Sequence, residues 1–177
     1  MNFIFGTPIW KLDSDSFDEK KITEEIYKAK ELDPEGIVKS NIGGYHSGFG
    51  FSAPRTDAYI KRRLESEGGL DFPHHIINKW FNINNKGDSN KPHDHGVVGL
   101  SGVLFITEAP GLILNSINKE SLLEELVKIF PFMGSNYFIN GKPGEIVIFP
   151  STIVHWVEPS NSDSARITYA FNIEVNT

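Results

Sequence analysis

Apolar residues recur at two different spacings along this chain, and the two spacings predict two kinds of element. In residues 17–31, Ile22, Ile26 and Ala29 follow one another three or four positions apart, which indicates an amphipathic helix. Residues 56–67 are expected to form a second helix that ends at a Gly-Gly pair. The first third of the chain is therefore predicted to contain two helices.

Beyond residue 73 the apolar and polar positions alternate in short runs separated by Gly, Pro and Asn, a pattern typical of strands joined by turns. A third helix is predicted over 119–129, as an insertion between strands, and the glycine-rich segment 41–51 is expected to be irregular. Helices followed by many short strands favour a β-sandwich or barrel with helices outside it. The predicted strands are 3–12, 73–83, 99–107, 111–115, 137–139, 145–149, 152–158 and 166–175.

Composition limits the possible classes of function. A length of 177 residues fits one domain covering residues 1–177. A net charge of −6 without a cluster of Lys and Arg gives no reason to expect nucleic acid or an anionic membrane as partner. Because there is no cysteine, disulfides and thiolate metal sites are excluded. The chain shows neither a signal peptide nor an apolar run of about 20 residues, so we expect a cytoplasmic protein.

Three histidines form the candidate metal site. His93 and His95 are two residues apart, so on a strand both rings would point to the same face. His155 lies in a separate apolar run, where burying an imidazole without a partner costs about 1–3 kcal/mol. Metal coordination is one way to recover that cost. Three such ligands with open positions are the arrangement that non-haem Fe(II) oxygenases require.

Arg166 begins an alternating strand eleven residues after His155 and is the candidate anion-binding residue. Its guanidinium can pair with a carboxylate through two hydrogen bonds, although an arginine at a strand edge can also simply be solvated. Thr168 lies on the same face and could add a hydroxyl to the same carboxylate. Asn82 is a further candidate for contact with a bound cosubstrate.

Several blocks of the sequence resemble, in their order and spacing, a family of Fe(II)/2-oxoglutarate-dependent oxygenases. That family carries W-x-N, H-x-H, an L-S-G-V strand, FPS followed by His, and R-I-x-x-A-F-N in this order. The matching blocks here are SNIGGYHSGFGF (40–51), the run from Trp80 to Ile106, PGEIVIFPSTIVHWVEP (143–159) and ARITYAFNI (165–173).

The resemblance implies a double-stranded β-helix, also called a jelly roll or cupin-like fold. It also implies Fe(II) and 2-oxoglutarate as cofactors, and hydroxylation of an unidentified substrate with conversion of 2-oxoglutarate to succinate. Carried over by position, His93 and His155 are metal ligands, and Arg166 and Thr168 bind the cosubstrate. The wider superfamily has a carboxylate where this chain has His95. We expect His95 to be the ligand; the alternatives are that Asp94 turns inward through a bulge, or that position 95 only lines the site.

Two other classes of protein are compatible with the same residues. One is a cupin-type three-histidine metal protein, either a small-ligand binder or a dioxygenase that does not use 2-oxoglutarate. The other is a carbohydrate-binding or structural jelly roll in which the histidines are incidental. The substrate, a small molecule or a peptidyl side chain, does not follow from the sequence, and neither does the oligomeric state.

Overall fold

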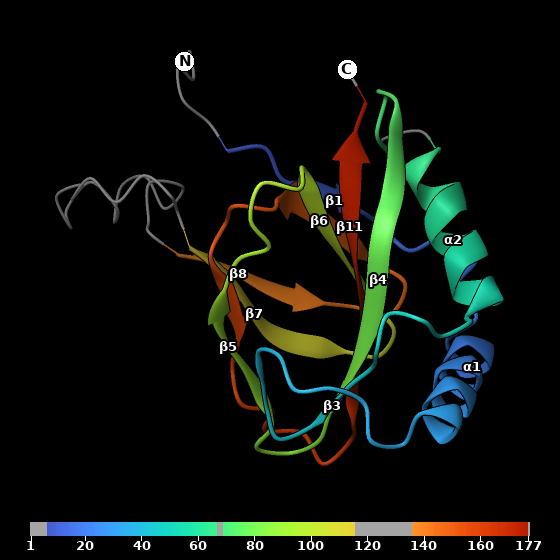
Figure 1. Cartoon of the computed structure of the whole chain (residues 1–177), viewed down its shortest axis with the longest axis vertical. Helices are drawn as coiled ribbons and strands as arrows, with labels where there is room; N and C mark the ends of the chain where they lie inside the picture. Colours follow the sequence, from blue (N-terminus) through green and yellow to red (C-terminus); the bar gives the residue numbers. More distant parts are fainter. Residues whose placement is uncertain (1–6, 67–68, 116–135, 177) are drawn as a thin grey trace, which may run out of the picture.

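Two antiparallel sheets face each other, and two helices cover the outer face of one sheet (Figure 1). The structure, a computed structural model, describes residues 7–66, 69–115 and 136–176. The helices are α1 (Glu19–Leu32) and α2 (Pro54–Leu64). The strands are β1 (Trp10–Leu12), β2 (Asn41–Ile42), β3 (Tyr45–His46), β4 (His74–Asn84), β5 (Ser89–His93), β6 (Leu100–Phe105), β7 (Ala109–Asn115), β8 (Asn136–Gly141), β9 (Ile146–Pro150), β10 (His155–Val157) and β11 (Arg166–Val175).

Within the described residues, the strands from β4 to β11 form one long antiparallel hairpin that is rolled into both sheets. β4 pairs with β11, β5 with β10, β6 with β9, and β7 with β8. Successive pairs alternate between the sheet ordered β1-β9-β6-β11-β4-β3 and the sheet ordered β2-β5-β10-β7-β8. This pairing is that of a double-stranded β-helix, so the predicted mainly β fold with flanking helices is confirmed.

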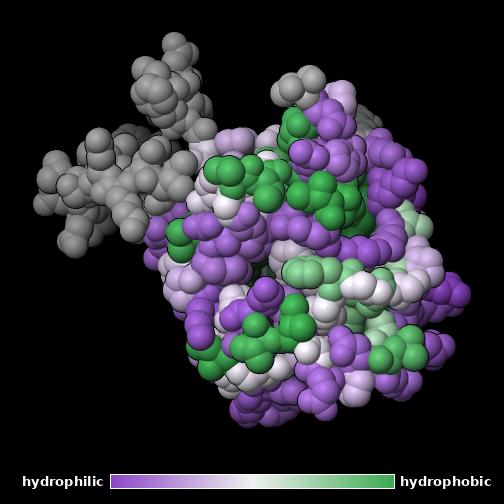
Figure 2. Space-filling view, viewed as in Figure 1, coloured by the Kyte–Doolittle hydropathy of each residue, from purple (hydrophilic) through white to green (hydrophobic). Residues whose placement is uncertain are grey.

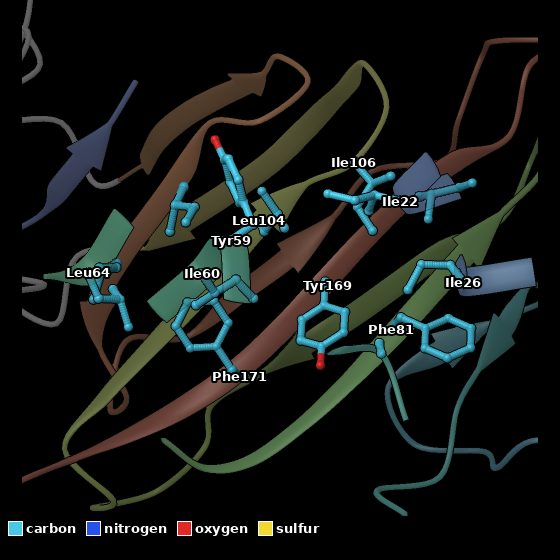
Figure 3. Close-up of a cluster of buried hydrophobic side chains, with 14 of the residues drawn as sticks. Ile22, Ile26, Tyr59, Ile60, Leu64, Phe81, Leu104, Ile106, Tyr169 and Phe171 are labelled. Atoms are coloured by element: carbon cyan, nitrogen blue, oxygen red, sulfur yellow. The ribbon is translucent and has the colours of Figure 1, made fainter. Parts of the chain in front are cut away.

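The two long central strands, β4 and β11, separate the helices from the interior of the roll. Odd-numbered residues such as Phe81, Tyr169 and Phe171 are buried against the helices, where they meet Ile26 and Ile60 (Figure 3). The even-numbered residues of both strands point the other way, into the space between the sheets. Those positions carry Trp80, Asn82, Asn84, Arg166, Thr168, Ala170 and Asn172. The alternation places a polar lining inside the roll and an apolar layer outside it.

The helices occur where the apolar periodicity predicts them, with shifted ends. α1 begins after Asp18, whose carboxylate accepts a hydrogen bond from the Lys21 amide at 3.1 Å. α2 begins at Pro54, two residues before the predicted start. Proline suits the first turn of a helix because the N–H that it lacks has no partner there. The Glu25 carboxylate on α1 accepts from the Arg55 and Thr56 amides at 2.9 Å each, and this joins the two helices.

Four of the other predicted elements differ from the structure or lie partly or wholly outside it. The segment 41–51, expected to be irregular, contributes the short strands β2 and β3, which add to sheet edges already present. The strand expected over 152–158 is reduced to β10, because a turn precedes His155. The strand expected over 3–12 is described only from residue 7 and is β1. The helix predicted over 119–129 lies outside the described residues.

The space between the sheets has an apolar end and a polar end. At the apolar end, Phe105, Leu112, Val147 and Phe149 pack together from both sheets. A side chain at Gly141 would place its Cβ 2.1 Å from the Phe105 ring, so only glycine permits this approach. The polar end contains a cavity. None of the helices in the described residues is long and apolar enough to cross a membrane.

Candidate functional site

Three histidine rings meet at the polar end of the roll. His93 is the last residue of β5 and His155 is the first of β10, and the two face each other across the strand pair. Ring centroids are 4.3 Å apart for His93 and His155, 4.9 Å for His95 and His155, and 5.3 Å for His93 and His95. One ring nitrogen from each lies within 4.8 Å of the others, so a single ion can bind all three after small side-chain shifts.

His95 joins this group for a reason that differs from the sequence prediction. The prediction that residues 93 to 95 share one strand is wrong, because β5 ends at His93. The Asp94 carboxylate accepts a hydrogen bond from the Gly96 amide at 2.9 Å, and Gly96 has a φ of +71°, so the chain turns here. The His95 amide donates to the Ser151 carbonyl at 2.9 Å. This contact between two loops places His95 beside the other rings.

Asp94 is not part of the convergent group. Its carboxylate is exposed, and its hydrogen bond to the Gly96 amide belongs to the turn itself. Among the described residues, the His, Asp and Glu side chains whose ligand atoms converge on this point are His93, His95 and His155. The geometry therefore favours His95 over Asp94 as the third metal-binding side chain.

Hydrogen bonds at Nδ1 set the tautomer of the rings. The Nδ1 atom of His93 lies 2.7 Å from the Lys91 carbonyl, and that of His155 lies 2.9 Å from the Ile153 carbonyl. A carbonyl can only accept, so each Nδ1 carries the proton and donates it. The Nε2 atom is then left with a free lone pair, which is the form of histidine that binds metals.

His95 is held by side chains instead of a carbonyl. Its Nδ1 atom lies 2.8 Å from both Ser101 Oγ and Asn172 Oδ1. The Ser101 hydroxyl donates to Asn172 Oδ1 at 2.9 Å, and the Asn172 amide nitrogen donates to Asn78 Oδ1 at 2.8 Å. With Asn172 oriented by Asn78, the oxygens of Ser101 and Asn172 both accept from His95. The Nε2 atom of His95 is thus also unprotonated.

Burial keeps the three rings neutral. Burial first, and then the neighbouring His93, lower the pKa of His155 from 6.5 to about 3. The pKa values of His93 and His95 are also lowered, mainly by burial. Neutral imidazoles are the form that coordinates a metal, so no proton has to be removed at neutral pH. The three rings are therefore neutral nitrogen donors before any metal binds.

A cavity lined by these histidines extends between the sheets to Arg166. Arg166 is 4% exposed and donates to the carbonyls of Pro110, Glu158 and Asp88 at 3.1, 2.9 and 3.2 Å. These bonds use three of the five N–H donors of a guanidinium. Within the described residues no carboxylate lies within ion-pair distance of it. The charge of Asp88 acts on the guanidinium from beyond that distance, but a buried cation without a directly paired carboxylate is still costly, so the cavity favours an anionic ligand.

Thr168 and Asn82 lie beside Arg166 on the cavity wall, where the sequence predicted them. Thr168 pairs directly with Asn82, and Arg166 pairs with Asn84, across the β11–β4 ladder. The Oδ1 atoms of Asn82 and Asn84 are buried and have no hydrogen-bond partner among the residues that the structure describes. Unsatisfied buried amides are rare and mark a place where a ligand or water completes the hydrogen bonding. All six predicted site residues thus border one cavity.

Some residues of the site were not identified from the sequence. Ser101 and Asn172, which hold His95, sit inside the quoted L-S-G-V and R-I-x-x-A-F-N blocks, and that position was the available signal. Asn78 and Asn84 follow from the same alternation along β4 that singled out Asn82. Their roles depend on cross-strand pairing, which a single sequence does not reveal.

Comparison with known proteins gives one family and many structures of the same fold. The family model described as "Putative 2OG-Fe(II) oxygenase" matches residues 78–172, more than half of the chain. The matched segment contains the three histidines, Arg166 and Asn172. No curated protein sequence matches the chain.

Three solved structures illustrate the similarity of fold. The non-haem α-ketoglutarate-dependent carbocyclase SnoK from nogalamycin biosynthesis has a TM-score of 0.67 at 11% identity, over 94% of this chain and 79% of that one. HygX from Streptomyces hygroscopicus, with nickel and 2-oxoglutarate bound, has a TM-score of 0.63 at 10% identity, over 96% and 83%. A prolyl-4-hydroxylase from Pseudomonas putida has a TM-score of 0.63 at 14% identity, over 97% and 94%.

Proposed function

This chain belongs to the 2OG-Fe(II) oxygenase family, and we propose that His93, His95 and His155 hold its Fe(II) while Arg166, Thr168 and Asn82 bind 2-oxoglutarate. Family membership makes the protein a 2-oxoglutarate- and Fe(II)-dependent oxygenase whose substrate is not identified. The observation that carries the assignment of residues is that the three unprotonated Nε2 donors and the unpaired Arg166 face one cavity.

The residues fit the metal. Imidazole nitrogen suits iron as a ligand, and three donors leave coordination positions open for a cosubstrate and oxygen. Because the imidazoles are neutral, this donor set leaves both positive charges of Fe(II) uncompensated. A dianionic cosubstrate in the same cavity balances them. This offers a physical reason why a chain without a carboxylate ligand can still hold the iron and the cosubstrate together.

The residues also fit 2-oxoglutarate. The distal carboxylate of that molecule supplies the counter-ion that Arg166 lacks among the described residues. The Thr168 hydroxyl can donate to the same carboxylate. The amide group of Asn82 can rotate to present its nitrogen as a donor. Trp80 and Phe105 form apolar parts of the wall beside these polar groups, where an aliphatic chain is well accommodated.

When bound together, the iron and 2-oxoglutarate supply oxidative decarboxylation of the cosubstrate to succinate and carbon dioxide, coupled to hydroxylation of a substrate C–H bond. The protein's own part is positioning. Arg166 fixes one end of the cosubstrate, and the hydrogen bonds to Ser101 and Asn172 fix the ring of His95. Phe149, whose ring centroid is 5.0 Å from that of His155, shields the site from water on the apolar side.

The test is measurement of carbon dioxide and succinate released from 2-oxoglutarate by protein loaded with Fe(II) in air. We expect slow release without substrate that is abolished in His93→Ala and His155→Ala. Metal content of the same samples shows whether lost activity follows lost iron. Iron bound at one equivalent without any 2-oxoglutarate binding would contradict the proposal and favour the alternative.

The alternative function is a cupin-type three-histidine metal protein that does not use 2-oxoglutarate. It accounts for the neutral ligand set. It gives no role to the buried Arg166 or to the unpartnered oxygens of Asn82 and Asn84. For this reason the proposal keeps 2-oxoglutarate as the cosubstrate.

The whole chain, residues 1–177, is proposed to act as one domain, supported by the core that α1 and α2 share with β4 and β11. A cytoplasmic location stays a prediction, which cell fractionation tests directly.

A further inference from the structure

A second cavity opens next to the histidines and contains neither Arg166 nor Thr168. It has a volume of about 630 Å³ and shares Trp80, His93 and His95 with the inner cavity. The two cavities follow one another along the central strands, because the outer one begins at Asn78 and Asn172 and the inner one at Trp80 and Ala170. Its volume is in the range typical of sites for small molecules. It therefore has the position and size required of a substrate site.

The wall of this outer cavity is aromatic on the side of the histidines. The Trp80 ring stacks on His46 with centroids 5.9 Å apart and planes at 6°. The rings of Phe49 and His95 contact the same indole edge-on, with centroids 6.0 Å and 5.1 Å from that of Trp80. Trp80 is thus held on several sides next to a proposed iron ligand. A flat or apolar substrate can pack here with little loss of side-chain freedom.

The rim of the cavity is apolar in part. The segment between α1 and α2, sky blue to cyan in Figure 1, crosses the front of the molecule, and Figure 2 shows green hydrophobic surface over this part of the same face. From this segment, Val38 and Phe49 line the cavity although they are 83% and 50% exposed. Apolar side chains left exposed beside a cavity mark a binding surface.

Two lysines give the same cavity a positive charge. Lys39 and Lys91 come from segments that lie side by side, since the Lys91 amide donates to the Ser40 carbonyl at 2.8 Å. In the described part of the chain, neither ammonium has an ion-pair partner. Asp94 also lines the cavity, and the charge of its carboxylate acts on His93 and His95, so the two lysines and this carboxylate sum to one positive charge. Other described lysines, such as Lys28 and Lys61, also have no ion pair, so what distinguishes Lys39 and Lys91 is that both line the cavity.

This local charge is opposite to that of the chain, whose net charge is −6. Burial first, and also the positive charge of Lys39, lowers the pKa of His46, so Lys39 acts on the cavity wall. Both lysine side chains are exposed, and an anion that lies between them is attracted by both charges. The pair is therefore suited to bind a carboxylate or a phosphate.

We propose that the outer cavity is the substrate site and that the substrate is a small anion, with a carboxylate or phosphate at Lys39 and Lys91 and an apolar or aromatic body against Trp80 and Phe49. The body then lies next to His93 and His95, where the reaction takes place. This inference rests on the proposed function, since it assigns the substrate class of the same site.

The experiment uses protein loaded with Ni(II), which is inert toward oxygen chemistry here, and saturated with 2-oxoglutarate. Binding of both is measured first, because failure at that step contradicts the proposed function and not the substrate class. Isothermal titration calorimetry then compares 3-phenylpropanoate with its neutral counterpart 3-phenylpropanamide, and 2-phenylethyl phosphate with 2-phenylethanol. The two pairs distinguish a carboxylate site from a phosphate site.

We expect one of the two anions to bind about three- to tenfold more tightly than its neutral counterpart at low ionic strength, and the ratio to shrink as salt is added. The double variant Lys39→Gln, Lys91→Gln should bring this ratio close to one and leave 2-oxoglutarate affinity unchanged. The matched control is Lys28→Gln, which removes an exposed charge from α1, outside the cavity.

Three results would overturn the proposal. One is that neither anion binds more tightly than its neutral counterpart. Another is that the preference persists in the double variant. The third is that the double variant weakens 2-oxoglutarate as much as it weakens the probe, which would make the lysines part of the cosubstrate site.

Discussion

The Nδ1 atom of His95 lies 2.8 Å from the Oδ1 atom of Asn172, a residue 77 positions later on the central strand β11. Asn172 also accepts from Ser101 and is itself oriented by Asn78. The amide oxygen of Asn172 therefore requires a donor at position 95, and protonated Nδ1 of a histidine provides one. A carboxylate at the same position would meet the oxygen of Asn172 with another acceptor.

Replacing Asn172 with Ala should weaken metal binding about tenfold, the lower end of the effect typical for losing the hydrogen-bond partner of a metal-binding histidine. The reason is that His95 loses one of two acceptors and its ring becomes free to turn. Ser101→Ala should have a smaller effect, because Asn172 stays oriented by Asn78 and still accepts from His95, whereas in Asn172→Ala the Ser101 hydroxyl loses the acceptor that fixes its direction. Competition titration with Co(II) measures both affinities. Equal affinities for Asn172→Ala and wild type would mean that this contact does not position the ring.

Variants at positions 94 and 95 identify the third metal ligand. We expect the affinity for Co(II) to follow the order wild type, then His95→Asp, then His95→Ala. Asp recreates a two-histidine, one-carboxylate set but is shorter than imidazole and faces the oxygen of Asn172. Asp94→Ala should bind metal like wild type, because Asp94 is exposed and caps the Gly96 amide. The reverse ranking of Asp94→Ala and His95→Ala would make Asp94 the ligand.

Arg166→Met should remove the preference for a ligand with a distal carboxylate. Wild type is expected to bind 2-oxoglutarate at least about 30-fold more tightly than 2-oxopentanoate, since an unpaired buried charge costs about 2–5 kcal/mol. In the variant the two ligands should bind almost equally, with metal affinity little changed. The variant can lose stability because three carbonyls lose their bonds to Arg166. Such a loss affects the binding of both ligands alike, so it cancels in the ratio of their affinities.

Thr168→Val is the matched control for Arg166→Met. Valine has nearly the same shape as threonine and lacks only the hydroxyl. The preference for 2-oxoglutarate should therefore fall by a few-fold at most. A full preference for 2-oxoglutarate in Arg166→Met would show that another group binds the distal carboxylate.

The metal-free protein should lose stability in mild acid. Burial lowers the pKa of His155 to about 3 and lowers those of His93 and His95, whereas unfolded histidines bind protons below about pH 6.5. Between these limits the unfolded state binds more protons, so the free energy of unfolding falls as pH falls, by about 1.4 kcal/mol per pH unit for each such proton. Above about pH 6.5 this stabilisation is fully present.

Urea denaturation of the metal-free protein at about pH 7.5 and about pH 5.5 measures this effect. His155→Gln should show a shallower dependence on pH, because it removes the histidine with the largest shift. A variant as sensitive to acid as wild type would mean that other groups cause the loss.

The sequence alone was sufficient for the class of fold, because the alternation of apolar residues is a local property of the chain. Along ARITYAFNI the odd positions are apolar and the even ones carry Arg166, Thr168 and Asn172, and the structure buries the two sets on opposite faces of β11. The order of the motifs also pointed to the family. The helices α1 and α2 followed from the same kind of local periodicity.

Only the tertiary structure decided how the site is assembled, because its geometry depends on contacts between distant residues. Alternation along a strand does not direct His95 inward; the strand ends at His93, and the Ser151 carbonyl together with Ser101 and Asn172 holds the residue. Likewise, Lys39 and Lys91 line the same cavity only because β2 pairs with β5. Residue identity and local spacing can name the chemical groups, but the packing of distant segments determines which groups face one another.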